Sequence, residues 1–457
     1  MNLSVLASRT DGNLTGVDVP ISGVSIDTRT LCAGDTFIAL VGPNFDGHEF
    51  VLQAEEAGAQ ACVVSRKIEG AKKSVLLVND TYDALNALAR ICRENYSGCV
   101  AAITGSCGKT TIKGMLQSIC EQAGRCVATK GNLNNLIGVP LTLVRLNNAF
   151  DYAVVEAGTS VVGEIPALAG LIQPDVALVS NIMPAHVEGF GSVENIAKEK
   201  VALYQALNKE GVAVLNLDDD FVDYFKSETK AGKKIGFTLQ GNVSGVEGVD
   251  ETIGVSIVEH DNAGSPTICL KIEKNDYLLT LGVLGEHNVA NAAAAAAVAR
   301  AMNIGAAEIV EGLKQFSGEK RRMQLFKGAH GESVVDDSYN ANPGSVKAAI
   351  DYLSEYEDSI LVMGDMAELG SSAETEHKKI GDYAREAGIR SLFATGVLAN
   401  EAVSAFGVNA VWCESQAELL EKLVSRIKKN SVVLVKGSRS ARMEIIADAL
   451  RAAGEKQ

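Results

Sequence analysis

The sequence is short of positive charge and contains no long apolar run. Its 457 residues include 42 Lys and Arg against 57 Asp and Glu, which leaves a formal net charge of −15. Such a charge repels nucleic-acid backbones and anionic lipid surfaces, so neither is an expected partner. No segment approaches the roughly 18 apolar residues of a membrane span, and the first ten residues lack the basic and apolar regions of a leader. We therefore expect a cytoplasmic protein without membrane insertion.

The nine cysteines form no CxxC motif and no Cys/His cluster with the spacing of zinc ligands. Most of them stand within apolar runs, where cysteine behaves as a small core residue. Reduced thiols are therefore expected. The sequence also lacks fixed-period repeats, low-complexity tracts and a proline-rich linker, which predicts domains joined by short hinges.

The length predicts about three domains at roughly 150 residues each. Residues 1–80 alternate short β-like runs with turn signals, which indicates a small mixed α/β domain. Residues 81–312 open with a predicted helix at 81–95 and continue as strand, glycine turn, helix and strand, the order of a mostly parallel sheet. Residues 313–457 repeat strand and helix, which predicts a doubly wound, Rossmann-like domain. The expected fold class is therefore α/β in three domains.

The individual elements are predicted from apolar periodicity. In the first domain, strands are expected at 36–41, 61–65 and 74–78. In the central domain, strands are expected at 99–104, 125–129, 153–156, 176–181 and 212–216, a β-rich stretch from 232 to 285, and helices at 109–122, 193–207 and 290–302. In the third domain, strands are expected at 333–337, 359–364, 391–395 and 432–436, and helices at 345–353, 374–387, 399–406 and 441–452.

A glycine-rich turn between a predicted strand and a predicted helix is the strongest local signal. It reads Gly105-Ser106-Cys107-Gly108-Lys109-Thr110-Thr111 and is typical of a P-loop of the shorter G-x-x-G-K-T-T form. Its backbone N–H groups would cradle phosphate oxygens, Lys109 would reach the β and γ phosphates, and the Thr110 hydroxyl would bind Mg²⁺. The alternative is a plain strand-to-helix turn with a solvated lysine.

Five further segments decide between the reactions that a P-loop serves. They are Thr129 to Pro140 (TKGNLNNLIGVP), Ala185 to Gly191 (AHVEGFG), Asp336 to Pro343 (DDSYNANP), Gly364 to Gly370 (GDMAELG) and Val435 to Ser440 (VKGSRS). Together they resemble the Mur ligases, in the same order along nearly the whole chain.

The resemblance implies an ATP-dependent amide-bond ligase of peptidoglycan precursor synthesis. Asp336 to Pro343 is similar to the segment of the family member that adds D-Ala-D-Ala to a UDP-muramoyl-tripeptide through an acyl phosphate. The implied partners are these two small molecules, and the implied state is a monomer. The implied cofactors are ATP and two Mg²⁺ ions. Both lysine and diaminopimelate stay open as the third residue of the tripeptide.

The resemblance also implies the catalytic and metal-binding residues. Glu156 ends an apolar strand, so it is expected at the carboxyl edge of the sheet, where ligands of α/β folds bind. The family's metal ions would be held by Thr110, Glu156, His186 and Lys200, with Lys200 carbamylated by CO₂. The catalytic set would be Lys109, Glu156, His186 and Lys200. On sequence alone, Glu156 could be a solvated strand-end carboxylate, His186 a packed histidine and Lys200 a helix-surface lysine.

The nucleotide contacts implied by the resemblance come from two domains. His287, Asn288 and Asn291 would hold adenine, for which carboxamides offer both a donor and an acceptor. A second interpretation makes Asn288 the N-cap of the alanine-rich helix. Across an interdomain cleft, the nucleotide would be reached by Arg322, Asp337, Tyr339, Asn340 and Asn342. Without the family, Arg321-Arg322 could be an exposed basic pair.

The substrate contacts are expected in all three domains. Thr28, Arg29, Asp46, Gly47 and His48 would hold the UDP portion, although Asp46-Gly47 is also a typical turn. The remaining candidates are Asn134, Asn135, Lys436, Ser438 and Arg439, and the last three are expected to bind carboxylate or phosphate unless they form a plain loop.

Two other functions fit these motifs less well. Another amino-acid ligase on the same scaffold, or a folylpolyglutamate synthase, would carry different residues in place of Asp336 to Pro343. A catalytically silent P-loop scaffold would not need Lys109, Thr110, Glu156, His186 and Lys200 together. The sequence therefore favours an active ligase.

Overall fold

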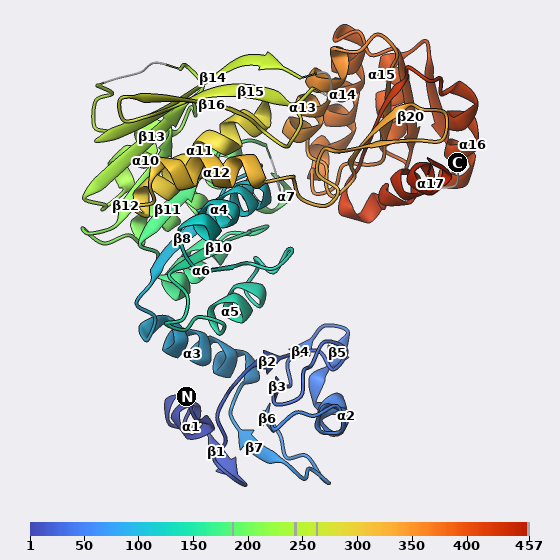
Figure 1. Ribbon diagram of the computed structural model, residues 1–457. Helices are drawn as coiled ribbons and strands as arrows, with labels where there is room; N and C mark the ends of the chain where they lie inside the picture. The colour runs from blue at the N-terminus through green and yellow to red at the C-terminus, as the bar shows by residue number, and fades with distance from the viewer. Residues whose placement is uncertain (185–186, 242–244, 262–263, 455–457) are drawn as a thin grey trace. The chain divides into compact units, whose positions relative to one another are not determined.

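The structure is a computed structural model that describes residues 1–184, 187–241, 245–261 and 264–454 (Figure 1). The chain divides into two compact units. The first comprises Met1–Val100, Gly124–Ala157 and Ala167–Gln173, and the second comprises Ala101–Ala123, Gly158–Pro166 and Pro174–Gln457. The first unit contains the predicted N-terminal domain, and the second contains the P-loop and the whole predicted C-terminal domain.

The N-terminal part of the first unit is built on a five-stranded sheet in the order β1-β7-β6-β3-β2. Only β1 runs antiparallel; β7, β6, β3 and β2 are parallel. The strands are β1 (Asn13–Thr15), β2 (Val24–Ser25), β3 (Thr36–Ile38), β6 (Ala61–Val64) and β7 (Ser74–Leu77). A separate hairpin joins β4 (Val41–Gly42) and β5 (Phe45–Asp46).

Helices cover both faces of this sheet because alternate strand residues are apolar on both sides. Ile38 and Val63 pack with α1 (Leu3–Arg9) and α3 (Thr81–Glu94). Phe37 and Cys62 pack on the other side, with α2 (Val51–Glu56), which follows the 3₁₀ turn η1 (Gly47–Phe50). The Asp80 carboxylate starts α3 by accepting hydrogen bonds from the amides of Tyr82 and Asp83.

The remainder of the first unit carries Glu156. Strands β9 (Cys126–Ala128) and β10 (Tyr152–Glu156) pair in parallel, and α5 (Gly138–Leu143) packs against α3. Helix α6 (Glu164–Ile172) ends in this unit, where the Arg93 guanidinium of α3 donates to the carbonyls of Ile172 and Gln173.

The second unit begins with a mostly parallel sheet. Its strand order is β16-β15-β14-β13-β12-β11-β8, in which β8, β11, β12, β13 and β14 are parallel and β15 and β16 antiparallel. The strands are β8 (Cys99–Thr104), β11 (Val176–Val179), β12 (Val212–Asn216), β13 (Lys233–Thr238), β14 (Glu251–His260), β15 (Pro266–Ile272) and β16 (Asn275–Thr280). The helices are α4 (Lys109–Ala123), α7 (Val187–Phe190), α8 (Val193–Lys200), α9 (Ala202–Gln205), α10 (Val222–Glu228), α11 (His287–Ala301) and α12 (Ala306–Gln315).

The alanine-rich α11 lies closest to this sheet. It contacts β11, β12, β13 and β14, and α4 packs against both α11 and α12. Small alanine side chains let the helix approach the strands, and most of its residues are buried. This packing brings the start of α11 beside the glycine-rich turn that precedes α4.

The C-terminal part of the second unit is a doubly wound sheet in the order β17-β18-β22-β19-β20-β21. Its strands are β17 (Gln324–Lys327), β18 (Ser333–Asp337), β19 (Ser359–Met363), β20 (Ser391–Thr395), β21 (Ala410–Cys413) and β22 (Val432–Lys436), and only β17 is antiparallel to its neighbour. The helices are α13 (Pro343–Ser354), α14 (Ala373–Glu386), α15 (Ala399–Phe406), α16 (Gln416–Arg426) and α17 (Glu444–Gly454), with 3₁₀ turns η2 (Gly370–Ser372) and η3 (Arg439–Ala441).

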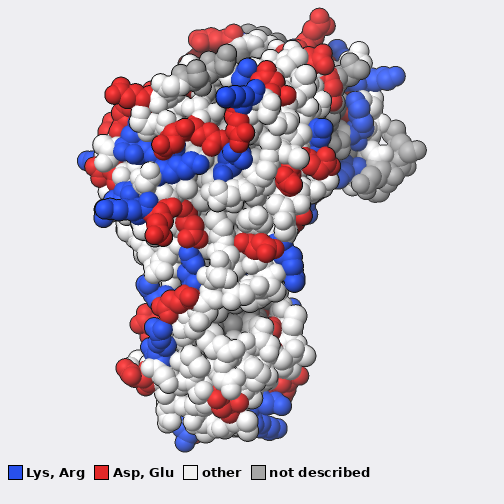
Figure 2. Space-filling model, turned by 60° about the vertical axis from the view of Figure 1, so that its left-hand side comes forward, with Lys and Arg blue, Asp and Glu red and all other residues white. Residues whose placement is uncertain are grey.

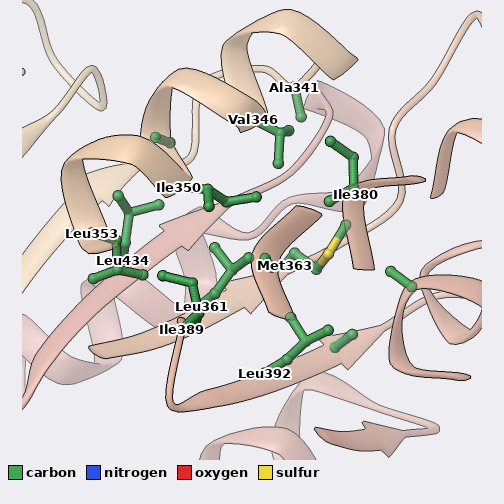
Figure 3. Packing of buried hydrophobic residues seen from close by; sticks show 14 of the residues in the cluster. Ala341, Val346, Ile350, Leu353, Leu361, Met363, Ile380, Ile389, Leu392 and Leu434 are labelled. Atoms are coloured by element: carbon green, nitrogen blue, oxygen red, sulfur yellow. The ribbon is translucent and has the colours of Figure 1, made fainter. Parts of the chain in front are cut away.

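Two apolar cores hold this part together, one on each face of the sheet. On one face, Ile350 and Leu353 of α13 lie against Leu361 and Leu434 of the strands, with α14 and α15 alongside (Figure 3). On the other face, α16 and α17 pack against the alternate strand residues such as Val433. Parallel strands buried on both faces read as continuous apolar runs, which is the pattern that the sequence showed.

The expected fold class is confirmed, with small differences at the element ends. The helix expected at 193–207 is divided into α8 and α9 at Val201. The elements that were not foreseen are α1, α2, α5, α6, α7, α10, α12, α16, β1, β2, β4, β5, β17 and β21. All nine cysteines lie within the described residues and form no disulfide, as expected. Among the described helices, none combines the length and the apolar character that a membrane crossing requires. Lysine, arginine and acidic side chains are interspersed on the face shown in Figure 2.

Candidate active site

The glycine-rich turn between β8 and α4 has the conformation of an anion cradle. Gly105 and Gly108 both have positive φ, of +147° and +82°. A Cβ at Gly105 would lie 1.9 Å from Ser180 Oγ, and one at Gly108 would lie 2.4 Å from Asn291 Oδ1. Neither position therefore accepts a side chain. The turn leads directly into the N-terminus of α4, and the positive end of a helix dipole favours a bound anion.

Polar side chains that follow β11 hold this turn in place. The amide of Cys107 donates to Asn181 Oδ1 at 2.9 Å, and Ser180 Oγ donates to the Cys107 carbonyl at 2.6 Å. The Ser106 hydroxyl donates to the carbonyl of Met183 and accepts from its amide, both at 3.0 Å. The cradle is thus preformed by its own support and does not depend on a ligand for its shape.

Lys109 folds back over the cradle from the first turn of α4. Its Nζ donates to the Gly105 carbonyl at 2.6 Å and to the Ser106 carbonyl at 3.3 Å. The ammonium group therefore sits at the mouth of the turn, where a bound phosphate would meet it. A fixed cation at this place suits transfer of a phosphoryl group, whose transition state carries spread negative charge.

Lys200, at the end of α8, is buried beside this lysine. Only 2% of Lys200 is exposed, and within the described residues its ammonium group makes no hydrogen bond or ion pair. Burial lowers its pKa well below the usual lysine value, and the charge of Lys109 lowers it further. The adjacent Glu199 offers no pairing, because its two oxygens accept the amides of Gly163 and Ile165 at 2.9 and 2.7 Å. Lys200 is therefore a buried amine whose neutral form is favoured.

The asparagines at the start of α11 lie against the cradle. Asn288 is not the N-cap of this helix, contrary to one of the two interpretations, because α11 begins at His287 after Glu286, whose side chain makes no cap hydrogen bond. Instead the Asn288 carboxamide donates to the Leu284 carbonyl at 2.7 Å and accepts from Asn291 Nδ2 at 2.8 Å. Both asparagines are buried.

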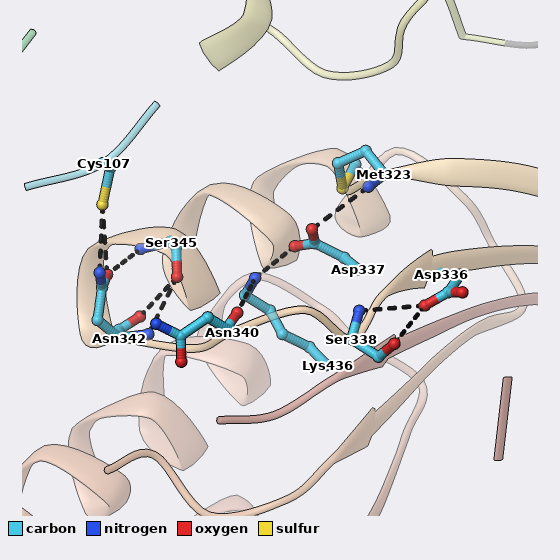
Figure 4. A network of polar contacts seen from close by, with 9 residues as sticks. All are labelled: Cys107, Met323, Asp336, Asp337, Ser338, Asn340, Asn342, Ser345 and Lys436. Atoms are coloured by element: carbon cyan, nitrogen blue, oxygen red, sulfur yellow. Dashed lines mark hydrogen bonds and ion pairs between the residues drawn. The ribbon is translucent and has the colours of Figure 1, made fainter. Parts of the chain in front are cut away.

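A buried ion pair marks the carboxyl edge of the C-terminal sheet. Lys436, at the end of β22, pairs with Asp337, at the end of the neighbouring β18, and donates to the Asn340 carbonyl at 3.1 Å (Figure 4). Asp337 also accepts the amide of Met323 at 3.3 Å. Burial lowers the pKa of His287, while the Asp337 carboxylate acts in the opposite direction.

Two side chains of the C-terminal region reach the glycine-rich turn. The Arg322 guanidinium donates to Thr110 Oγ1 at 3.0 Å and lies over the ring of Tyr339, 4.2 Å from its centroid. Asn342, which caps α13 through the amide of Ser345, contacts the Cys107 sulfur through its amide nitrogen at 3.3 Å (Figure 4). Arg322 is therefore no exposed basic residue, and its neighbour Arg321 pairs with Glu444 and Asp448.

The neighbouring loop after β22 is held by short-range contacts. The amide of Ser438 donates to the Asp365 carbonyl at 3.0 Å, and its hydroxyl lies 3.1 Å from that of Ser440. Arg439 pairs with Glu444 at 3.2 Å, yet its side chain stays 63% exposed. This loop therefore presents a cation at the same edge of the sheet as Lys436.

In the first unit, Glu156 is buried at the end of β10. Its backbone amide donates to Thr129 Oγ1 at 2.9 Å, and its Oε1 accepts from Asn134 Nδ2 at 2.7 Å. Just before α5, Asn135 Oδ1 accepts the amides of Ile137 at 3.2 Å and Gly138 at 2.8 Å. A 1% exposed carboxylate at the carboxyl end of a strand is no ordinary solvated side chain.

Matches to family models cover most of the chain. Residues 20–93 match the catalytic domain of the Mur ligase family, residues 103–299 match the Mur ligase middle domain, and residues 321–439 match the Mur ligase glutamate ligase domain. The chain is 36% identical to the UDP-N-acetylmuramoyl-tripeptide--D-alanyl-D-alanine ligase of Escherichia coli strain K12, with 99% of each chain covered. The chain belongs to the Mur ligase family.

Solved structures of Mur ligases share the fold along the whole chain. The crystal structure of MurF from Acinetobacter baumannii has a TM-score of 0.88 at 34% identity, with 98% of each chain covered. MurF from Thermotoga maritima in complex with ADP has a TM-score of 0.79 at 26% identity, with 95% of this chain and 98% of that chain covered. The match therefore spans the entire Mur ligase architecture.

Within each unit, the structure brings together many of the residues expected from sequence. In the second unit, contacts connect the P-loop to Asn291, Arg322 and Asn342, and Lys436 to Asp337 and Asn340. The first unit holds Glu156 with Asn134. His186 lies outside the described residues. Within the described ranges, no group of three or more His, Cys, Asp and Glu side chains has metal-binding geometry.

Supporting residues of this Mur ligase site were missed by sequence reasoning. Ser180, Asn181 and Glu199 hold the cradle and the start of α6. Ser180 and Asn181 are a polar pair at the end of an apolar run, and Glu199 lies within a charged run, so neither pattern marks a site. The one available signal was position, since Ser180 and Asn181 directly follow β11 at the carboxyl edge of the sheet.

Proposed function

We propose that the chain is an ATP-dependent ligase that joins D-Ala-D-Ala to UDP-N-acetylmuramoyl-tripeptide. ATP transfers its γ-phosphoryl group to the terminal carboxylate of the tripeptide and leaves as ADP. The amine of the dipeptide then attacks the acyl phosphate, loses a proton, and expels inorganic phosphate. The products are the UDP-muramoyl-pentapeptide of peptidoglycan synthesis, ADP and phosphate.

One observation carries this proposal: the end-to-end match to a ligase named for this reaction, on a chain whose phosphate cradle is intact. The E. coli relative aligns over 99% of each chain, so each predicted domain has its counterpart. The cradle adds the chemistry that the name requires, with a preformed turn and a fixed Lys109. A silent scaffold would have no use for a buried lysine such as Lys200, which has no hydrogen-bond or ion-pair partner among the described residues.

In this proposal the P-loop binds the β and γ phosphates of ATP. The N-terminus of α4 and Lys109 would face the phosphate oxygens, and Arg322 adds a second cation next to Thr110. Two like-charged reactants, a carboxylate and ATP, must approach each other, so fixed positive charge has its main value in the transition state. His287, Asn288 and Asn291 hold the adenine, while Asp337, Tyr339, Asn340 and Asn342 border the nucleotide from the C-terminal domain.

The proposed metal is Mg²⁺, and the donor set fits it in kind. Thr110 and Glu156 would supply oxygen ligands, which Mg²⁺ prefers, and a carbamate on Lys200 would supply two more. His186 completes the predicted set. When bound, Mg²⁺ neutralises the phosphate charge; Lys109 and Arg322 orient the phosphates, and Glu156 is held by Asn134.

We further propose that Lys200 carries a carbamate. The neutral amine attacks CO₂, a C–N bond forms, and one proton leaves, so an amine becomes a carboxylate-like anion. Protonated lysine has no lone pair for this step, and the pKa of Lys200 is lowered chiefly by burial. An amine without a hydrogen-bond or ion-pair partner among the described residues, next to the cation Lys109, supports this modification because the carbamate would gain a counter-charge.

The three domains are proposed as 1–80, 81–312 and 313–457, each with one substrate. Thr28, Arg29, Asp46, Gly47 and His48 of the first hold the UDP portion, and Asn134 and Asn135 of the second border the tripeptide. Lys436, Ser438 and Arg439 of the third bind carboxylate or phosphate. We propose that the enzyme works as a monomer in the cytoplasm, since its substrates are small, polar molecules.

Phosphate release tests the proposal directly. The chain is incubated with ATP, Mg²⁺ and UDP-muramoyl-tripeptide, with D-Ala-D-Ala present or withheld, and the products are weighed by mass spectrometry. We expect dipeptide-dependent phosphate release and a pentapeptide product in equal amounts. Phosphate release at the same rate without the dipeptide, or faster release with a single amino acid than with D-Ala-D-Ala, would contradict the proposed function.

A further inference from the structure

A hydrogen-bonded chain of Asp46, His48 and Ser65 stands at the carboxyl edge of the N-terminal sheet. Asp46 Oδ1 lies 2.6 Å from His48 Nδ1, and His48 Nε2 lies 3.1 Å from Ser65 Oγ. The order Asp, His, Ser is that of a hydrolase triad. However, Nε2 already accepts the backbone amide of Ser65 at 2.9 Å. A neutral imidazole has one lone pair, so His48 is not available as a base for the hydroxyl.

The chain therefore acts as a brace, and the group that it holds is Arg66. The His48 side chain is 1% exposed and fixes Asp46 through both its ring and its backbone amide. Those hydrogen bonds lower the pKa of Asp46, which stays ionised. Its second oxygen, Oδ2, binds Arg66 Nη1 at 2.9 Å, while the Arg66 side chain remains 58% exposed. Within the described residues, the guanidinium makes no further hydrogen bond.

The strand order places a second held guanidinium at the same edge. Strands β6, β3 and β2 are parallel neighbours, so their carboxyl ends share one edge of the sheet (Figure 1). Arg66 follows β6 by two residues. Arg29 follows β2, is 85% exposed, and is bound by both oxygens of Asp27 at 2.6–3.1 Å.

We propose that Arg66 is a binding residue for the diphosphate of the nucleotide substrate, held in position by Asp46 and His48. The inference rests on the proposed function, and it names a residue that the sequence motifs did not. A guanidinium presents several N–H donors in a fixed plane that matches phosphate oxygens, and one carboxylate contact leaves donors unused. Because Asp46 already holds one edge of the Arg66 guanidinium, little side-chain freedom is lost when the diphosphate binds. Asp46 and His48 are positioning residues, since both ring nitrogens of His48 are engaged.

The test compares Arg66→Ala and Arg66→Lys with a matched control, Arg9→Ala. Arg9 is an exposed arginine of the same unit, 2.7 Å from its partner Glu94, and it precedes β1, the outer strand on the opposite side of the sheet from β2. Isothermal titration measures binding of UDP and of UMP to the full chain, and steady-state kinetics measures KM for each substrate.

We expect Arg66→Ala to weaken UDP binding about tenfold and UMP binding less, because a charge-assisted contact to the second phosphate is lost. KM for UDP-muramoyl-tripeptide should rise by a similar factor with kcat and the KM of ATP unchanged. Arg66→Lys should fall between, and Arg9→Ala should match the unmodified chain.

UDP affinity within twofold of the unmodified chain in Arg66→Ala would overturn the inference, as would an unmodified chain that does not bind UDP. An equal loss of affinity for UDP and for UMP would also overturn the inference, because Arg66 would then make no contact specific to the second phosphate. Failure of the proposed function is a separate result, namely no dipeptide-dependent turnover by a chain that still binds UDP.

Discussion

Two phosphate-binding regions of this molecule are built in opposite ways. In the second unit, the turn from Gly105 to Thr111 leads into the N-terminus of α4 and carries a lysine that folds over its own loop. In the first unit, the edge after β2 and β6, where we propose that the diphosphate binds, offers exposed guanidinium groups, each held by a carboxylate. The first design concentrates fixed charge where charge develops during reaction. The second provides contacts that are equally good before and during reaction.

This difference predicts which kinetic constant each region controls. Interactions made only in the transition state change kcat, whereas uniform binding changes KM. Variants of the glycine-rich turn should therefore lower kcat, and variants of the guanidinium edge should raise KM for the nucleotide substrate. A variant of the turn that changes only KM, or a variant of the guanidinium edge that lowers kcat, would contradict this comparison.

Lys109→Met should have the largest effect. The methionine keeps the length of the side chain but removes the cation at the mouth of the turn, and we expect kcat to fall about 10³-fold. The measurement is single-turnover phosphate release with saturating ATP. Lys314→Ala, an exposed lysine of α12, is the control and should retain full kcat. A raised KM with an unchanged kcat in Lys109→Met would contradict the assignment of Lys109 as the cation that stabilises the transition state.

Lys200→Ala should lower kcat about 100-fold, because the variant loses the carbamate oxygens that would hold Mg²⁺ beside the phosphates. With ¹³C-bicarbonate, the unmodified chain should show a carbamate signal by ¹³C NMR that disappears in Lys200→Ala. Lys198→Ala, an exposed lysine of the same helix, should keep both the signal and the activity. A signal that persists without Lys200 would place the modification elsewhere.

Asp337→Asn should test the buried pair with Lys436. Lys436 is 3% exposed in the side chain, so loss of its counter-charge should lower the free energy of unfolding by about 3 kcal/mol. Chemical denaturation of the full chain measures this change. The control Asp223→Asn breaks an exposed pair with Lys226 and should cost less than about 0.5 kcal/mol. Equal losses for the two variants would show that burial does not set the strength of the Lys436 pair.

The smallest effect concerns pH. The folded pKa of Lys200 lies below its unfolded value, so the unfolded chain binds the extra proton between the two values. The free energy of unfolding therefore rises with pH in that window, by at most about 1.4 kcal/mol per pH unit, and falls as pH is lowered through it.

Denaturation of Lys200→Met in bicarbonate-free buffer isolates this contribution. Relative to the unmodified chain, the variant should lose that slope and be more stable at the acidic end of the window, because it buries no amine. Parallel pH profiles of the two proteins would contradict the lowered pKa.

Sequence reasoning predicted the sheets and the central cradle because both depend on local patterns. Apolar runs predicted the bounds of β8, β12, β18 and β22 to the residue. A parallel strand buried on both faces is a continuous apolar run, so the ends of the run mark the ends of the strand. The glycines of the turn can be recognised from the sequence, because a side chain at either position would be strained by the positive φ and would clash with close neighbours.

Side-chain support could not be foreseen in the same way. The contact of Arg66 with Asp46 joins residues from two different strand ends, and the pairing of Glu199 with the amides before α6 joins segments far apart in the sequence. No local periodicity encodes such contacts. The Asn288 capping interpretation failed for a related reason. The helix starts at His287, two residues before the start that an Asn288 cap would set, and the Asn288 side-chain amide donates to the Leu284 carbonyl of the preceding loop.

The central claim is that the tripeptide carboxylate is activated as an acyl phosphate within this chain. It is tested most directly with UDP-muramoyl-tripeptide whose terminal carboxylate carries ¹⁸O in both oxygens. If the carboxylate attacks ATP and the dipeptide amine then displaces phosphate, each released phosphate must contain one ¹⁸O atom, in an amount equal to the pentapeptide formed. Release of unlabelled phosphate alongside pentapeptide would contradict the account.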